Sequence, residues 1–195
     1  ISKKKKRAFI DETYWGKPVP SFGDVPPKVF ILGLAPAAHG ANRTGRMFTG
    51  DQSGLWLYRA LYENKLSTKE NSEHKNDNLR LKKCYISAAV HCAPPDNKPT
   101  TVEINNCKEY LEKELEIFNS IQVYLALGRL AYDQIWKNLN QKQKKQKFSH
   151  GKIITLDNHK KLVLSFHPSQ QNTFTKRLTK EMFDDVFNFI SKEIK

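Results

Sequence analysis

The sequence contains no apolar run long enough to cross a membrane. Its longest stretch without charge, residues 29–42, is shorter than the ~20 apolar residues that a spanning helix needs, and it includes Pro36 and His39. The basic residues 1–7 are followed by neither an apolar segment nor a small-residue cleavage site, which is not typical of a secretory signal. Three cysteines among 195 residues do not suggest a disulfide framework. We therefore expect an intracellular, cytoplasmic protein without membrane contact.

Acidic residues are outnumbered by basic ones. The chain has 20 Asp and Glu against 33 Lys and Arg, which gives a formal net charge of +13. This excess indicates a polyanionic partner, and nucleic acid is the commonest one inside cells. Hydrophobic residues make up 38% of the chain, enough for the core of one domain of this length, which excludes a wholly disordered protein. We expect a single domain over residues 1–195.

Four short apolar segments without alternation predict strands that are buried on both faces: residues 29–34, 85–90, 121–127 and 161–166. Segments with helical spacing lie at 54–64, 101–118, 128–139 and 178–194. Alternating strands and helices predict an α/β fold, a three-layer α/β/α sandwich with a central four-stranded parallel sheet. Because ligands bind beyond the carboxyl ends of such strands, the loops after Leu34, Val90 and Phe166 should lie together.

Three polar regions interrupt this pattern. Residues 1–7 form a basic tail, and residues 65–83 and 138–152 are expected to be exposed loops. Charge runs of this kind are usually solvated and have no specific task. The sequence shows no internal repeat and no second domain boundary.

The loop after the first expected strand, residues 33–51, contains four of the nine glycines. Glycine lets backbone N–H groups approach an anion or a flat ligand closely, although a structural turn is the alternative. Arg43 and Arg46 favour phosphate, because a guanidinium binds it with two hydrogen bonds. Two of the glycines are spaced as in an ATP-binding loop, but Arg46 and Met47 replace the residues that hold phosphate and magnesium, which argues against an NTPase. Phe48 is either a platform for a base or a core residue.

Five motifs together resemble the family 5 uracil-DNA glycosylases. They are GLAPA at 33–37, HGANRTGR at 39–46, FTGD at 48–51, CAPPDNKPT at 92–100 and HPSQQNT at 167–173. The likeness extends over nearly the whole chain, from Ala8 to the helix after Arg177. It implies an enzyme of base excision DNA repair, which turns uracil out of DNA, binds it at the strand ends and hydrolyses its bond to deoxyribose.

His167 follows the last expected strand, and Pro168 biases it toward an extended backbone that points at the first loop. A neutral imidazole can donate a hydrogen bond to the carbonyl oxygen of a departing pyrimidine. The residues alone leave this role and simple packing equally open. The resemblance favours the catalytic role.

The reaction also needs a residue that orients the attacking water. Relatives in other families carry Asp, Glu or Asn directly after the first strand, where this chain has Ala35. The resemblance instead implies that Asn42 and Asn97 orient water or stabilise the sugar cation. An amide is no general base, so we expect a largely dissociative reaction. Asp51 is a reserve candidate, and capping of a helix is the alternative for it.

The resemblance also implies a base pocket, built by Gly33, Leu34, Ala35, Pro36, Ala37, Phe48 and Ala88. Ala88 stands where several sister families have an asparagine that reads the edge of uracil. Such a pocket should discriminate less between bases. We therefore expect that other deaminated bases, such as hypoxanthine, are removed as well.

DNA contacts are expected from residues in or beside the three loops: Arg43, Arg46, Lys98, Ser169, Gln170, Gln171, Lys176 and Arg177. They should bind phosphates and fill the gap left by the flipped nucleotide, so that activity falls steeply with salt. We expect a monomer. Two other functions stay open, a noncatalytic nucleic-acid-binding domain and a hydrolase of free nucleosides or nucleotides.

Cys92 and Cys107 match two of the four cysteines that hold a [4Fe-4S] cluster in the family. Read by themselves, two free buried thiols are the more ordinary interpretation. An all-cysteine cluster needs four thiolates, so either the natural start precedes Ile1 or the cluster is absent. In the full-length protein its role would be structural. Cys84 matches no ligand position and is expected to pack as a small apolar residue.

Overall fold

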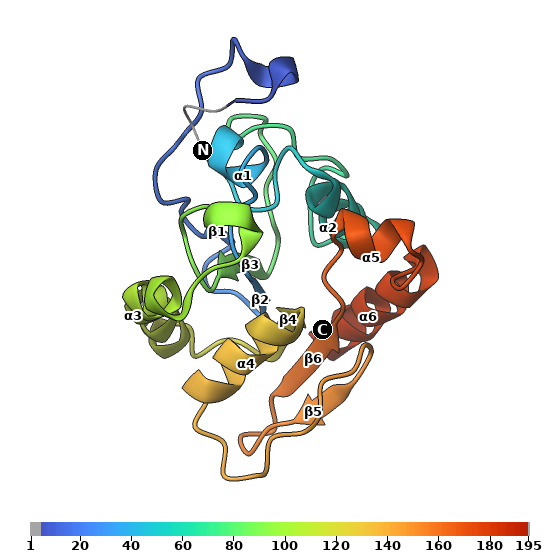
Figure 1. Ribbon diagram of the computed structural model, residues 1–195. Coiled ribbons are helices and arrows are strands. Elements are labelled where there is room, and N and C mark those ends of the chain that lie inside the picture. The colour runs from blue at the N-terminus through green and yellow to red at the C-terminus, as the bar shows by residue number, and fades with distance from the viewer. Residues whose placement is uncertain (1–4, 195) are drawn as a thin grey trace.

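The computed structural model describes residues 5–194, which form one sheet between two layers of helices (Figure 1). The strand order within these residues is β1-β3-β2-β4-β6-β5. Four parallel neighbours make up the centre: β3 (Cys84–Ala88), β2 (Val29–Gly33), β4 (Val123–Leu127) and β6 (Lys161–Ser165). The prediction of an α/β fold with four central parallel strands is confirmed.

Two short strands that were not expected lie at the edges of the sheet. β1 (Phe22–Gly23) pairs antiparallel with β3, and β5 (Ile153–Thr155) pairs antiparallel with β6. Strands of two and three residues are too short to show a periodicity in the sequence. β5 consists of β-branched residues, Ile-Ile-Thr, but it follows a long polar segment, and so short a run does not stand out beside that segment in the sequence.

Successive residues of β2 point to opposite faces of the sheet and divide the core in two. Ile31 packs in one cluster with Leu57 and Phe183, whereas Leu32 packs in the other with Leu111 and Ile135. Figure 1 shows the corresponding helices on the two sides of the sheet. They are α2 (Gln52–Glu63) and α6 (Lys180–Glu193) on one face, and α3 (Thr101–Ile117) and α4 (Arg129–Asn138) on the other.

Three of these helices begin at residues whose side chains cap them. Asp51 accepts a hydrogen bond from the N–H of Gly54 at the start of α2 (2.9 Å). Thr100 and Glu103 form a reciprocal capping box at α3. Thr179 caps α6. The short elements are η1 (Arg7–Phe9), α1 (Ala41–Thr44), η2 (Pro95–Asn97) and α5 (Gln170–Phe174).

Segment 65–83 differs from the exposed loop expected from its charge. Ser67 and Leu81 form an isolated antiparallel bridge, and Leu66 and Leu79 are buried. In segment 138–152 most side chains are exposed, but His150 is packed against the end of β6. Of the expected basic tail, residues 1–4 lie outside the described part of the chain. Within residues 5–194, no helix combines the length and apolar character that crossing a bilayer requires.

Candidate active site

The loops that follow β2, β3 and β6 meet at the carboxyl edge of the sheet, as the topology predicts. Gly33 at the end of β2 lies opposite Ala88 at the end of β3. The pairing continues beyond both strands, because the N–H of Ala89 donates to Gly33 O (3.1 Å) and the N–H of Val90 to Leu34 O (3.0 Å). The beginning of the first loop is therefore fixed by backbone hydrogen bonds.

Phe48 and His167 stack at this edge. Their ring centroids are 5.7 Å apart and their planes are inclined by 26°. The Phe48 ring lies directly on the backbone of Gly33, where a Cβ atom would be 2.8 Å from Phe48 Cζ. His167 from the last parallel strand thus reaches the glycine loop of the first, which is the arrangement expected from the sequence.

The backbone of Phe48 is held in place by a second glycine. A Cβ at Gly54 would lie 1.9 Å from the carbonyl oxygen of Phe48, so only glycine lets the first turn of α2 approach this closely. The hydroxyl of Tyr58 donates to the carbonyl of the preceding residue, Met47, at 2.9 Å. These contacts allow Phe48 to adopt a left-handed backbone conformation with φ 53°.

His167 is fixed through its backbone as well as its ring. Its carbonyl accepts a hydrogen bond from Asn172 Nδ2 (2.8 Å), and a Cβ at Gly128 would be 3.5 Å from the Cβ of His167. Burial lowers the pKa of His167 to about 4. The imidazole is therefore neutral near pH 7 and carries one N–H for donation, which suits a donor to a departing oxygen.

A groove of about 730 Å³ opens beside His167. Phe148 and Phe166 contribute aromatic rings to its walls, and Asn172 contributes an amide. Its basic lining residues are Arg129, Lys145, Lys147 and Arg177. A positively charged groove with aromatic rings is typical of a path for a nucleic-acid strand.

Asn42 and Asn97 lie in different surroundings. Asn42 is buried in α1, and its Nδ2 donates to the carbonyl of Ala38 (3.2 Å). Asn97 is exposed in η2, with a left-handed φ of 55°, and Lys98 beside it is exposed too. Ala35 carries no polar side chain and cannot order water itself.

The expected pocket residues differ in exposure. Gly33, Pro36 and Ala88 are buried, whereas Leu34, Ala35, Ala37 and Phe48 are partly exposed. The second group therefore has surface that is open to solvent. Ala88 presents only a buried methyl group.

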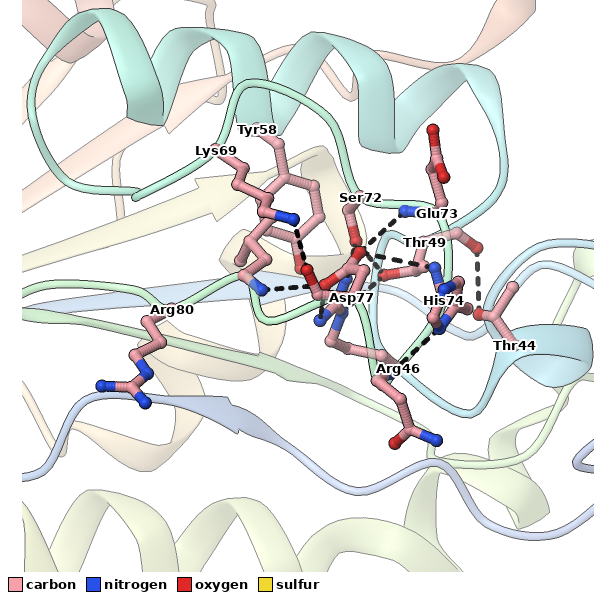
Figure 2. Close-up of polar contacts among 12 residues, drawn as sticks. Thr44, Arg46, Thr49, Tyr58, Lys69, Ser72, Glu73, His74, Asp77 and Arg80 are labelled. Atoms are coloured by element: carbon pink, nitrogen blue, oxygen red, sulfur yellow. Dashed lines mark hydrogen bonds and ion pairs between the residues drawn. The ribbon is translucent and has the colours of Figure 1, made fainter.

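The prediction that Arg46 contacts DNA is wrong. Its side chain is only 4% exposed and forms a two-armed ion pair with Asp77 (Figure 2). Its Nε donates to Thr49 Oγ1 at 3.1 Å, and Ser72 accepts from the guanidinium as well. Every nitrogen of this guanidinium is thus turned into the protein, and none is available for a phosphate.

Arg43 is also engaged within the protein. It pairs with Glu12, donates from Nε to the carbonyl of His39 (2.8 Å), and lies over the ring of Phe9. Its side chain is 13% exposed. A phosphate would have to compete with these partners.

Asp51 caps α2, which is the alternative that the sequence left open for it. The carboxylate also lies against Gly40, where a Cβ would be 2.1 Å from Oδ2. Burial raises the pKa of Asp51, although hydrogen bonds from the backbone of Gly54 and Ser53 and the charge of Arg43 oppose this. The geometry gives Asp51 a structural task.

The residues expected to fill the gap in DNA lie on or beside α5. Ser169 caps this helix by accepting from the N–H of Asn172 (3.4 Å). Gln170, Gln171 and Lys176 are exposed. Arg177 is exposed and lies over the ring of Phe166 (4.6 Å).

Cys92 precedes η2, and Cys107 lies within α3, close enough to influence the thiol of Cys92. Partial burial, the thiol of Cys107 and the carboxylate of Glu103 together raise the pKa of Cys92. Cys84 is buried, as expected, and burial raises the pKa of its thiol. Over residues 5–194 no group of three or more His, Cys, Asp or Glu side chains is arranged to hold a metal ion. Two thiols do not fit a complete four-cysteine cluster.

Two residues beside the site were missed in the sequence, Asp77 and His150. Both lie in the polar segments that were expected to be exposed loops. The only signal for them is the residue type itself, an acid and a histidine in otherwise featureless stretches. Their partners are distant in the sequence, so no local spacing could identify them.

Comparison with known proteins agrees with this geometry. Residues 20–191 match the family described as the uracil DNA glycosylase superfamily. The chain is 47% identical to the type-5 uracil-DNA glycosylase of Thermus thermophilus, an alignment that covers 93% of this chain and 83% of that protein. It is 45% identical to the type-5 enzyme of Mycobacterium leprae (96% and 83%) and 43% identical to that of Pyrobaculum aerophilum (94% and 79%). The chain therefore belongs to the uracil DNA glycosylase superfamily and, within it, to the type-5 uracil-DNA glycosylases.

Proposed function

We propose that this protein removes uracil from DNA by hydrolysing the bond between the base and deoxyribose, leaving an abasic site. The observation that carries this function is the neutral imidazole of His167, stacked on Phe48 beside the backbone of Gly33. The family membership supports the same reaction. The protein acts as a monomer on DNA inside the cell.

The reaction begins when the nucleotide leaves the base stack, which costs a few kcal/mol. The basic groove beside His167 offsets this cost by binding the phosphate backbone. Once the bond to the sugar stretches, negative charge develops on the pyrimidine. His167 donates its N–H to the carbonyl oxygen there, and removal of such a donor typically lowers the rate by ~10²-fold or more.

The sugar becomes positively charged as the base departs. Asn42 and Asn97 provide amide oxygens that stabilise this charge and orient water. Ala35 has only a methyl group and cannot activate water. Since an amide is no base, water adds after the bond is nearly broken, and the proton that it then loses passes to the released uracil anion or to solvent. Asp51 is not needed for this step because it is occupied as a helix cap.

We also propose that other deaminated bases, such as hypoxanthine, are substrates. Ala88 is buried and has no polar atom with which to read the hydrogen-bonding edge of a base. Excision of uracil, hypoxanthine and xanthine, each placed opposite all four bases in otherwise identical duplexes, tests this proposal. A strict preference for uracil would refute it.

Cys92 and Cys107 would be two of the four ligands of a [4Fe-4S] cluster of the family type. The described residues do not complete the set of four, so no step of the reaction is derived through a cluster. In a protein that holds one, its task would be to fix the loop that carries Asn97. Absorption of the cluster in the visible range tests for it.

The function is tested by measuring free uracil released from a uracil-containing oligonucleotide. The parent protein should release the base, and His167→Ala should be slower by ~10²-fold or more. The exposed histidine variant His159→Asn is the matched control and should act like the parent. Binding without release would indicate a noncatalytic DNA-binding domain, and equal turnover of free deoxyuridine would indicate a nucleoside hydrolase.

A further inference from the structure

The side chain of His150 accepts a hydrogen bond from the backbone just beyond β6, where a neighbouring strand would otherwise supply the acceptor. On the side that faces β5, Leu164 pairs with the neighbouring backbone through the N–H of Gly151 (2.8 Å) and the carbonyl of Lys152 (2.9 Å). The next N–H on this side belongs to Phe166, because N–H groups of a strand alternate in direction. Here the neighbouring chain has turned away at Gly151, which has φ 73°. His150 Nδ1 takes the place of a strand carbonyl and accepts from Phe166 N at 3.1 Å.

The second ring nitrogen of His150, Nε2, is hydrogen-bonded to helix α6. Nε2 lies 3.1 Å from the carbonyl oxygen of Met182 in α6. A carbonyl can only accept, so Nε2 carries the proton, and a backbone N–H can only donate, so Nδ1 of His150 is unprotonated. The imidazole is therefore neutral, in one defined tautomer. Burial, the largest influence, lowers the pKa of His150 and favours this form, while Asp185 of α6 opposes it.

The ring of His150 also stacks on the ring of Phe166, with centroids 5.2 Å apart and planes inclined by 22°. The hydroxyl of Ser165 lies 3.4 Å from Nδ1 but donates to the carbonyl of Phe166 (2.9 Å). Both the N–H and the carbonyl of Phe166 are thus held by side chains. The residue that comes next in the chain is His167.

We infer that His150 is a positioning residue for His167, and that it acts through the N–H of Phe166. This inference rests on the proposed function, because it assigns His167 a place in the reaction. Fixing the backbone of Phe166 sets the direction in which the Cβ of His167 leaves the chain. A donor that is displaced by 1 Å can lower a rate by ~10²-fold.

Two amide variants separate this role from simple packing. In His150→Asn the amide oxygen occupies the place of Nδ1 and can still accept from Phe166 N, but the bond to Met182 is lost. In His150→Gln the amide reaches the place of Nε2 and retains the bond to Met182, but Phe166 N loses its acceptor. His150→Phe keeps a ring for stacking and offers no acceptor.

The rate constant of uracil release should depend on whether residue 150 offers an acceptor to the N–H of Phe166, and not on whether it carries an aromatic ring. His150→Asn should keep kcat close to that of the parent, whereas His150→Gln and His150→Phe should lower kcat by ~10- to 100-fold with little change in KM. Melting temperatures identify variants that fold, and either of the two acceptor-free variants is sufficient for the comparison. Parent-like kcat in a folded Gln or Phe variant would overturn the inference. An equal loss in all three variants would also overturn it.

Hydrogen exchange at the amide of Phe166, followed by NMR, gives a readout that does not depend on activity. Exchange should be slow in the parent and in His150→Asn, and faster in His150→Gln and His150→Phe. A parent protein that releases no uracil would refute the proposed function, while the exchange rates would still decide whether His150 holds Phe166. Unchanged protection in the acceptor-free variants would contradict that contact.

Discussion

Arg46 and Asp77 are 31 residues apart in the sequence and face each other in a buried ion pair. Nη1 of the guanidinium donates to Oδ1 at 2.8 Å, and Nη2 donates to Oδ2. Figure 2 shows Thr49 and Ser72 beside the pair. The pair connects the loop that carries Phe48 with segment 65–83. A polar segment that would otherwise be solvated thus supports one wall of the active site.

Removal of Asp77 should destabilise the fold strongly. Asp77→Ala leaves a guanidinium buried without its partner, which typically costs ~3–5 kcal/mol of the free energy of unfolding. Urea denaturation measures this loss, and Glu70→Ala, an exposed acid in the same segment, is the control. The double variant Arg46→Met, Asp77→Leu should be less destabilised than Asp77→Ala because no charge stays buried alone, but it still loses the bonds that Asp77 accepts from the N–H groups of Glu73 and Leu79. Equal effects of Asp77→Ala and Glu70→Ala would show that the pair contributes nothing.

The same pair predicts a loss of stability in acid. Burial opposes ionisation of Asp77, but Arg46 and the backbone N–H groups of Leu79 and Glu73 outweigh it and hold its pKa well below the usual range. The contribution of a carboxylate with a lowered pKa is present above the unfolded value of about 3.9 and is lost as the pH falls through the folded value.

His167 gives a second pH dependence at higher pH. An unfolded imidazole binds a proton near pH 6.5, whereas burial lowers the pKa of His167 to about 4. Between these values the unfolded state binds more protons, so stability should fall as the pH is lowered through this window. Denaturation at pH 7 and pH 5 should show a smaller decline for His167→Ala than for the parent or for His159→Asn. An NMR titration that protonates His167 near pH 6.5 would contradict the neutral imidazole.

The central sheet was predictable because each of its four parallel strands is mainly apolar and does not alternate with polar residues. Residues 29–34 correspond to β2, and the other three parallel strands lie within about two residues of their expected positions. Local pattern also placed His167 near the first loop, since the carboxyl ends of parallel strands meet. It could not show that Arg46 is buried, because the partner Asp77 stands in a segment without any apolar spacing. His150 was missed because it stands itself in a polar segment, and its partners Phe166 and Met182 form their hydrogen bonds to it only through their backbones.

Substitution of Asp51 separates a cap from a catalytic base. Asn is as good an N-cap as Asp and carries no charge, so Asp51→Asn should keep α2 intact. Because burial raises the pKa of Asp51, its charge is unfavourable in the folded state, and the variant should be at least as stable at pH 7. Uracil release should stay near that of the parent. A loss of ~10²-fold or more in a stable variant would instead identify Asp51 as a catalytic group.

Lys98, in the loop after β3, and Arg46, in the loop after β2, should differ in their effect on the salt dependence of DNA binding. Lys98 is exposed beside Asn97, so Lys98→Ala should reduce the slope of log Kd against log salt by ~1. Arg46 is buried, and a folded Arg46→Met, Asp77→Leu variant should keep the slope of the parent. Binding to a uracil-containing duplex at several salt concentrations measures both. An unchanged slope for Lys98→Ala would place this side chain away from the phosphates.

Asn42 and Asn97 are tested by replacing each with a residue that suits its backbone. Asn42→Ala keeps the helix α1, and Asn97→Gly tolerates the left-handed φ of 55°. Each loss of an electrostatic contact should lower the rate of uracil release by ~10²-fold.

Two other asparagines of this chain provide matched controls. Asn64 donates to a carbonyl four residues earlier, as Asn42 does, and Asn140 has a left-handed φ of 47°. Asn64→Ala and Asn140→Gly should therefore change the free energy of unfolding by a similar amount, without lowering the rate of uracil release. The double variant Asn42→Ala, Asn97→Gly should be nearly inactive on uracil while still binding DNA. If it released uracil as fast as the two control variants, neither amide would stabilise the sugar cation, and the water would have to be ordered by another group at the end of β2.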